Sequence, residues 1–375
     1  MKLKWMSAKK RELKPKSKLR EWREAIIFAV VVATLIRWGT VEAFVIPTPS
    51  MENSLLVGDY LFVSKLHYGA RTPRTPLQIP LTHQKVWGTE IPSYLTWIQL
   101  PSWRLPGISS VKREDAVVFN VPDLTMNEGE ERPIDLKTYY VKRCVGLPGD
   151  TLTIIDRKII VNGSTLTEPE HMKFSYFVTA KDEINKRNFV GLDIDGDDYY
   201  YLGRMNNNRA LYKMFLTDAQ VQNLKATPYV LSVEDDYTKN DWPDSDIFPN
   251  AMRNLWNGDN YGPVIVPKKG ITIPIDNTTL EMYGEMIRLY EHHDEVSIIN
   301  DKLTVDGIHI REYTFQQDYY FMMGDSRHNS LDSRYWGFVP ADHIVGKPLF
   351  IWFSVNQHAD LLHKIRWSRI FSAVD

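Results

Sequence analysis

A short apolar run near the amino end limits how the rest of the chain can be placed. Residues 25–36 read AIIFAVVVATLI, and residues 1–23 before them hold ten Lys or Arg and two Glu. A basic tail can bind nucleic acid, but basic residues that run straight into an apolar helix are typical of the cytoplasmic flank of a membrane segment. We therefore predict a basic cytoplasmic tail (1–23), a transmembrane anchor (24–46) in contact with lipid, a body outside the membrane, and no binding of nucleic acid.

The predicted anchor is short. Its uncharged run covers about 12 residues, whereas a bilayer core requires roughly 20, and Arg37 and Glu42 interrupt the extension. Counted from Ala25 to Ile46, a helix at about 1.5 Å per residue reaches about 33 Å, which spans if Arg37 snorkels to the far interface. A cleaved secretion signal is the alternative. Arg37 and Trp38 stand where its small-residue cleavage site would follow, so an uncleaved anchor is favoured.

The remaining body is large enough for one large domain or two ordinary ones. The chain has 375 residues, 43% of them hydrophobic, and its single cysteine, Cys144, excludes an internal disulfide or a cysteine-cluster zinc site. Runs rich in aromatic and β-branched residues predict strands at 60–63, 115–119, 138–146 and 347–353.

Residues 69–112 form a proline-rich stretch. Six prolines lie too close together for helices and are unsuited to central strands, so we predict a long extended excursion. Trp87, Trp97 and Trp103 interleave with these prolines. They either anchor the excursion by packing beneath it or form a patch that rests on lipid headgroups.

Two stretches of the body repeat one pattern. Residues 152–166, LTIIDRKIIVNGSTL, match residues 296–310, VSIINDKLTVDGIHI, and the turn pairs of each predict a hairpin. Between them we infer an inserted accessory β-rich region (167–294) with helices at 213–224 and 277–293. The run Glu291-His292-His293-Asp294 has metal-ligand types. Histidines at a helix end commonly complement the helix dipole instead, and we predict no metal.

Ser50 is the best nucleophile candidate. Pro47 and Pro49 fix the backbone around it and disfavour a helix, which predicts a rigid extended turn that presents the hydroxyl. The alternative is an ordinary tight turn that leads into the strand at 60–63.

Charged residues mark two later segments. In the predicted strand 138–146, alternation places Lys142 and Arg143 on opposite faces, so one cation must face the interior if both faces are covered. An edge strand with both charges solvated is the alternative. Residues 324–337, GDSRHNSLDSRYWG, hold acids and arginines that would be costly to bury unless they satisfied one another. We predict an ordered, hydrogen-bonded loop there.

Five motifs, taken in order, resemble the signature boxes of the bacterial type I signal peptidases. They are IPTPSM (46–51), GDYLFVSKLHYG (58–69), DAVVF (115–119), YYVKRCVGLPGD (139–150) and GDSRHNSLDSRYWGFVP (324–340). The resemblance implies a mainly β fold, with a catalytic β core in two parts (47–166 and 295–375) on the periplasmic face of the inner membrane. It also implies a monomeric serine endopeptidase, without a cofactor, that cleaves signal peptides from exported preproteins.

The resemblance assigns roles by motif position. Ser50 matches the nucleophile and Lys142 the general base, which acts only when neutral, and burial in an apolar setting favours the neutral form. Thr48 matches the oxyanion-hole hydroxyl, and Ser330 the serine that orients the lysine. The positions that match the supporting network are Asp325, Arg327, Asp332 and Arg334.

Shallow apolar pockets are a further implication, because such pockets admit only small side chains and lead to Ala-x-Ala-like cleavage sites. The matching positions are Phe44, Ile46, Met51, Leu55, Leu61, Val118, Tyr140 and Val141. The chain departs from the family pattern at several positions. Thr48 replaces the usual serine, and Pro49 replaces a common glycine, so the oxyanion hole depends on Thr48 and the amide of Ser50.

Two other functions fit the same motifs. One is a specialised serine-lysine protease that processes a single exported substrate. The other is a non-catalytic binding protein, tethered to the membrane, that retains the same scaffold.

Overall fold

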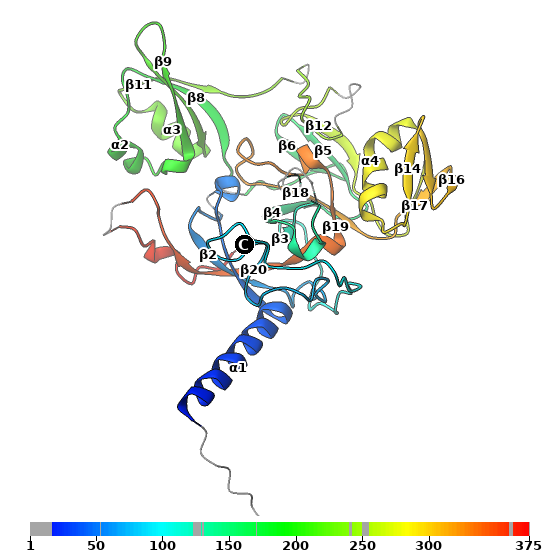
Figure 1. The fold of residues 1–375 in the computed structure, drawn as a ribbon. Coiled ribbons are helices and arrows are strands. Elements are labelled where there is room, and N and C mark those ends of the chain that lie inside the picture. The colour runs from blue at the N-terminus through cyan, green and yellow to red at the C-terminus, as the bar shows by residue number, and fades with distance from the viewer. Residues whose placement is uncertain are drawn as a thin grey trace, which may run out of the picture.

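The computed structural model describes residues 17–52, 54–122, 129, 131–169, 171–239, 242–249, 255–359 and 363–374. Most of the predicted tail, residues 1–16, therefore lies outside the described part of the chain. The described part is mainly β, as predicted, with one long amino-terminal helix that leaves the body (Figure 1).

A seven-stranded antiparallel sheet forms the centre of the molecule. Its strands, in order across the sheet, are β1 (Val41–Val45), β2 (Asp59–Ser64), β20 (Ile344–Ser354), β3 (Ala116–Asn120), β4 (Tyr139–Gly146), β18 (Tyr319–Met323) and β19 (Val339–Pro340). All five residues of β3 are buried because alternate side chains enter two different clusters, Val118 in one and Val117 and Phe119 in the other. The predicted strands at 60–63, 115–119, 138–146 and 347–353 all lie in this sheet.

The repeated sequences, each predicted to form a hairpin, form two similar three-stranded meanders. The first consists of β5 (Thr151–Ile155), β6 (Lys158–Val161) and β7 (Ser164–Thr165), and the second of β14 (Val296–Ile299), β15 (Lys302–Val305) and β16 (Ile308–Ile310). In all four turns both central residues have positive φ, as at Asn162 (51°) and Gly163 (80°). Type I′ turns require this conformation, which suits Asn, Asp and Gly.

The insert between the meanders does not form one unit. Its first part is a separate sheet in the order β11-β8-β10-β9, which we call the accessory sheet. Its elements are β8 (Phe174–Ala180), α2 (Lys186–Gly191), β9 (Tyr199–Arg204), β10 (Ala210–Leu216), α3 (Asp218–Lys225) and β11 (Val230–Asp235). The predicted helix at 213–224 is therefore wrong in its first residues, 213–216, which complete β10.

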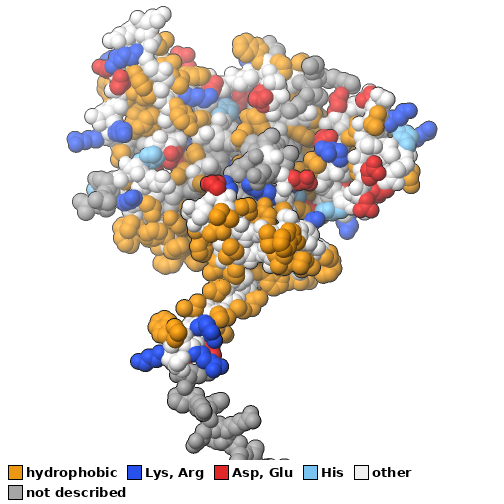
Figure 2. All heavy atoms as spheres, viewed as in Figure 1, with side chains coloured by type: hydrophobic (Ala, Val, Ile, Leu, Met, Phe, Trp, Pro, Cys, Tyr) orange, Lys and Arg blue, Asp and Glu red, His pale blue; other side chains and the backbone are white. Residues whose placement is uncertain are grey.

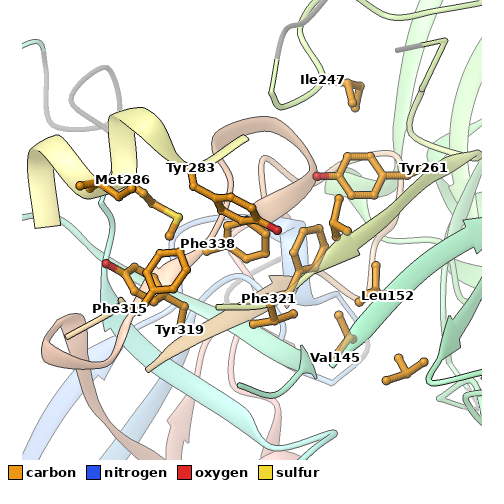
Figure 3. Packing of buried hydrophobic residues seen from close by; sticks show 14 of the residues in the cluster. Val145, Leu152, Ile247, Tyr261, Tyr283, Met286, Phe315, Tyr319, Phe321 and Phe338 are labelled. Carbon is orange, nitrogen blue, oxygen red and sulfur yellow. The ribbon is translucent and has the colours of Figure 1, made fainter. Parts of the chain in front are cut away.

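The second part of the insert joins the core. Strand β12 (Tyr261–Ile265) pairs with β5, and β13 (Thr272–Pro274) pairs with β17 (Glu312–Thr314). Helix α4 (Asn277–Tyr290) confirms the predicted helix at 277–293 apart from its last residues. Figure 3 shows Tyr283 of α4 and Tyr261 of β12 packed with Phe321 and Phe338, so the largest apolar cluster joins this part of the insert to the central sheet.

The amino-terminal helix differs from the predicted anchor. Helix α1 runs from Lys18 to Gly39, and residues 41–45 of the predicted anchor form β1, which pairs with β2. Arg37 forms an ion pair within the protein: its Nε lies 2.6 Å from Glu42 Oε1, and Lys65 Nζ lies 2.7 Å from the other oxygen of the same carboxylate. Within the described ranges, none of the helices combines the length and apolar character needed to cross a bilayer.

The predicted excursion at 69–112 is extended and forms only isolated bridges, such as Arg71 with Arg104. Its tryptophans are not buried anchors, since Trp87, Trp97 and Trp103 are 72%, 82% and 68% exposed. Figure 2 shows hydrophobic side chains gathered along α1 and over the part of the body that α1 joins. We define the basal apolar surface as the exposed hydrophobic side chains of α1 and of the excursion, which include Trp22, Phe28, Trp87, Trp97, Trp103 and Ile108.

Candidate active site

Ser50 lies in a single turn of 3-10 helix, Pro49–Met51, rather than in the predicted extended turn. Proline is tolerated there because the first residue of a helical turn needs no amide donor and takes the φ that proline fixes. Thr48 before it is extended, and its Oγ1 lies 3.5 Å from Ser50 Oγ. The two hydroxyls that the sequence singled out therefore lie side by side.

Lys142 approaches Ser50 from β4. This strand lies between β3 and β18, so the predicted alternative of an edge strand with solvated cations is wrong. Lys142 is 3% exposed, and its Nζ lies 2.5 Å from Ser50 Oγ, although 92 residues separate the two in sequence. Burial lowers the pKa of Lys142 from 10.5 to about 8, although the carboxylates of Asp332 and Asp325 act in the opposite direction. A substantial fraction of the amine is then neutral near pH 8.

Arg143 is buried as well, but it pairs with a carboxylate. Its Nε and Nη2 donate to the two oxygens of Asp325, both at 2.8 Å, in the bidentate geometry that makes such pairs strong. Ser54 Oγ donates to Asp325 Oδ2 at 2.6 Å. Asp325 thus connects β4 to the segment that carries Ser50.

A second buried pair organises the predicted polar loop. Arg334 Nε and Nη2 donate to the two oxygens of Asp332, and Gly324 N donates to Asp332 Oδ2 at 3.1 Å. Ser326 N in turn donates to Ser50 O at 3.1 Å. Within this loop Asp332 and Arg334 satisfy each other as predicted, whereas Asp325 pairs with Arg143 of β4 instead. The loop holds the backbone of Ser50 directly.

Ser330 and Arg327 are buried near the site, but their contacts differ from the predicted ones. Ser330 Oγ is buried and has no hydrogen-bond partner in the part of the chain that the structure describes, so it makes no bond to Lys142. The backbone N–H of Arg327 donates to Lys173 O, while its Nε has no hydrogen-bond partner among the described residues. Burial lowers the pKa of Arg327 to about 10.

Ser50 and Lys142 open into a groove of about 650 Å³, which we call the active-site groove. The predicted substrate-binding residues that line it are Phe44, Ile46, Leu61, Val118, Tyr140 and Val141. The other two, Met51 and Leu55, are fully buried in the apolar cluster behind Ser50 and do not line the groove. The helical turn at Ser50 directs these two side chains inward.

The groove has further lining residues that sequence reasoning missed. They include Val45, Pro47, Thr138, Tyr139, Tyr200, His328, Asn329, Leu331 and Tyr335. Val45 and Tyr139 neighbour predicted residues along β1 and β4, so a wider reading of those strands would have found them. Nothing near Tyr200 in the sequence indicates this site, because it comes from the accessory sheet.

The histidine-rich run after α4 makes contacts with protein groups. His292 Nε2 lies 2.8 Å from Asp342 Oδ2, and Glu291 accepts from the hydroxyls of Tyr313 and Tyr319. Among the described residues, no group of three or more His, Cys, Asp or Glu has the arrangement of a metal site.

A mainly β fold that buries a serine hydroxyl against a lysine of lowered pKa fits a serine hydrolase with a lysine base. The sequence profile of the family described as signal peptidase, peptidase S26, matches residues 19–210 and 270–353. The chain therefore belongs to the signal peptidase family, peptidase S26, and is a peptidase of that family. The predicted family is confirmed.

Individual relatives agree along most of the chain. A signal peptidase I of Helicobacter pylori (strain J99) is 26% identical over 364 residues, which cover 92% of this chain and 90% of the relative. That of Haemophilus influenzae is 24% identical over 381 residues, 97% of this chain and 78% of the relative. Signal peptidase I P of Bacillus subtilis subsp. natto is 27% identical over 189 residues, 50% of this chain and 70% of the relative.

Proposed function

We propose that this protein cleaves signal peptides from exported preproteins, with Ser50 as the nucleophile and Lys142 as the general base. The observation that carries the proposal is the 2.5 Å approach of Lys142 Nζ to Ser50 Oγ inside a largely apolar groove. A neutral amine at that distance can accept the hydroxyl proton, whereas an ammonium cannot.

Acylation follows from this geometry. Ser50 Oγ attacks the scissile carbonyl carbon while its proton passes to Lys142 Nζ. The negative charge on the carbonyl oxygen is stabilised by the amide of Ser50 and the hydroxyl of Thr48, which is 3.5 Å from Ser50 Oγ. When the tetrahedral intermediate collapses, the lysine ammonium gives its proton to the leaving amine. The amine departs as the new amino terminus, and the signal peptide stays as an ester on Ser50.

Deacylation uses the same base. Lys142, neutral again, removes a proton from a water molecule that attacks the ester carbonyl, and the same two donors stabilise the second oxyanion. Collapse of this intermediate returns a proton to Ser50 Oγ and releases the signal peptide. The carboxylates of Asp325 and Asp332 are each bound by an arginine, so neither contacts the lysine as a partner that would keep it charged.

The apolar side of the groove is proposed to bind the residues just before the cleavage site. Phe44 of β1 and Ile46 just after it line the groove together with Val118 of β3 and with Tyr140 and Val141 of β4. An extended peptide bound along these strands directs alternate side chains into the shallow apolar pockets. This arrangement favours small residues at two positions that are separated by one residue.

We also propose that the catalytic body rests on the outer face of the membrane, with the exposed apolar side chains of α1 inserted among the lipids as an anchor. Two observations support this. The apolar residues of α1 are exposed, and the basal apolar surface surrounds the point where α1 joins the body (Figure 2). Exposed tryptophans are typical of the lipid headgroup region.

The test is cleavage of a preprotein by the full-length protein in detergent. Ser50→Ala, Lys142→Ala and Lys142→Arg should each lose at least about a thousandfold in kcat/KM, the arginine variant because it stays protonated. Ser164→Ala and Lys158→Ala, at exposed positions of the first meander, serve as controls and should cleave normally. Full activity of a folded Ser50 or Lys142 variant would show the proposal to be wrong.

A further inference from the structure

One wall of the active-site groove comes from outside the catalytic core. Tyr200 lies in β9 of the accessory sheet, yet it lines the same groove as Ser50 and Lys142. Its side chain is 54% exposed, and its ring meets Phe215 edge-on with centroids 6.0 Å apart. An aromatic side chain held this way offers a free face at the groove.

The orientation of Tyr200 follows from alternation along β9. Tyr199 stacks on Phe189 of α2 with ring centroids 4.0 Å apart, and Tyr201 packs against Tyr212, so both lie on the side of the accessory sheet that α2 covers, where Tyr201 is still 44% exposed. Tyr200 and Leu202 project from the other side, where Leu202 is 51% exposed. Strand β9 is also the last strand of its sheet, and an edge strand can pair with an added extended chain.

The accessory sheet is attached to the loop at 324–337, so the position of Tyr200 relative to Ser50 is defined. Lys173 forms a backbone bridge with Ser326, and its buried ammonium pairs with Asp198, the residue directly before β9. Ser175 at the start of β8 lies within hydrogen-bond distance of His328 Nδ1, and His328 Nε2 lies 2.7 Å from Asp259 Oδ1. These contacts join the accessory sheet to the segment that also holds the backbone of Ser50.

The position of the accessory sheet indicates which part of a substrate it meets. Figure 1 shows it on the side of the body away from α1, whereas Figure 2 shows hydrophobic side chains gathered around α1. A signal peptide whose apolar segment is in the membrane reaches Ser50 from the α1 side. The chain beyond the scissile bond must then leave on the other side, past Tyr200.

We propose that Tyr200 and the open edge of β9 bind the first residues of the mature protein, on the carboxyl side of the scissile bond. This inference rests on the proposed function and extends it to the mature part of the substrate. The bound segment is an extended chain, whose backbone pairs with β9 while one uncharged side chain packs on the Tyr200 ring. The exposed Leu331, which lines the groove as well, supplies apolar contact area.

Two peptides with the same signal-peptide end test the proposal. The short one stops two residues after the scissile bond, and the long one continues for about ten. In the full-length protein, Tyr200→Ala should raise KM for the long peptide about three- to tenfold, with little change in kcat, and leave both constants for the short peptide unchanged. Tyr200→Phe keeps the ring and should match the wild type.

Tyr201→Ala is the matched control, since it removes a neighbouring tyrosine from the covered side of β9 and should not alter the ratio of the two KM values. The same ratio in Tyr200→Ala and wild type, or an equal rise for both peptides, would contradict the inference. Failure of the wild type to cleave either peptide would instead count against the proposed function. A photoreactive residue at the fourth mature position of the long peptide, beyond the end of the short one, gives an independent readout: it should label β9, and labelling confined to other segments overturns the inference.

Discussion

Lys142 and Arg143 are neighbouring cations in β4, and both are buried, but their partners differ. Arg143 has a bidentate carboxylate in Asp325, which compensates its charge, whereas Lys142 hydrogen-bonds the neutral hydroxyl of Ser50. Burial without a contacting carboxylate disfavours the ammonium form of Lys142, and its pKa falls to about 8. One strand thus carries a structural cation next to a group that can act as a base.

The lowered pKa of Lys142 predicts a pH profile. Only the neutral amine accepts the proton of Ser50, so kcat/KM should rise about tenfold per pH unit at low pH and level off above about pH 8. Initial rates with a short peptide between about pH 6 and pH 10 measure this limb. As a control, binding of a substrate without titrating groups to the Ser50→Ala variant is measured over the same pH range. The affinity should not show the apparent pKa that is seen in kcat/KM. A flat profile across this range would contradict a lysine base.

Glu52, two residues after Ser50, predicts a pH dependence of stability. Burial raises its pKa to about 8, although Lys173 acts in the opposite direction, and among the described residues its Oε2 has no hydrogen-bond partner. The folded state therefore holds this proton more tightly than the unfolded state, and the free energy of unfolding should fall as pH rises from about 4.5 to about 8.

Glu52→Gln should remove that dependence and stabilise the fold at pH 8 by on the order of 4 kcal/mol. Denaturant unfolding at several pH values measures the effect, with the exposed Glu234→Gln as the control. If the variant and the wild type lose stability in parallel over this window, Glu52 is not the responsible group.

At the scale of elements, the loop at 324–337 is packed closely against the turn that carries Ser50. A Cβ added at Gly324 would lie 2.3 Å from Ser330 Oγ and 2.5 Å from Ser50 O, distances at which atoms must move apart. The backbone oxygen of Ser50 moves only if the nucleophile turn moves. Glycine at this position therefore allows the loop and the turn to approach.

Gly324→Ala should consequently lower kcat by at least about tenfold and destabilise the protein by about 1–3 kcal/mol, because the added methyl overpacks the site. Gly307→Ala is the control: its Cβ would meet nothing within 4 Å, and its φ of +79° costs only about 1 kcal/mol. Peptide cleavage and thermal unfolding of both variants make the comparison. Normal turnover in Gly324→Ala would mean that the loop does not position Ser50.

At the scale of the whole molecule, the basal apolar surface and α1 lie on one side and the accessory sheet on another (Figures 1 and 2). Trp87, Trp97 and Trp103 belong to an extended excursion that contributes to this surface without forming a buried core of its own. Their exposure is explained if the surface faces the headgroup region, where tryptophan is favourable.

Replacing Trp87, Trp97 and Trp103 together by serine should weaken binding to phospholipid vesicles, measured by flotation, at least about tenfold. Cleavage of a soluble short peptide should stay within about twofold of the wild type, because none of the three lines the active-site groove. Trp242→Ser, at an exposed tryptophan outside the excursion, is the control. Unchanged flotation of the triple variant would exclude the excursion as a membrane contact.

The predictions from sequence succeeded where local structure depends on residues that are close together in sequence. Turn pairs such as Asn162-Gly163 adopt the positive φ that their residue types favour, and strand runs such as 138–146 form strands. They failed where distant contacts compete. Residues 213–216 continue a strand because β8 and β9 pair with them, and Arg37 turns back to Glu42 because that carboxylate is buried beside it.

By itself the sequence determined the strands at 60–63, 115–119, 138–146 and 347–353, the turns of the two repeats and the order of the motifs, since these depend on residue type and spacing along the chain. Only the tertiary structure decided that Lys142 reaches Ser50, that the lysine is buried, that Met51 and Leu55 point away from the groove, and that Tyr200 enters it. The physical reason is packing. The contact between Lys142 and Ser50, which are 92 residues apart, and the burial that lowers the pKa of Lys142 are both set by segments that meet only in the folded chain.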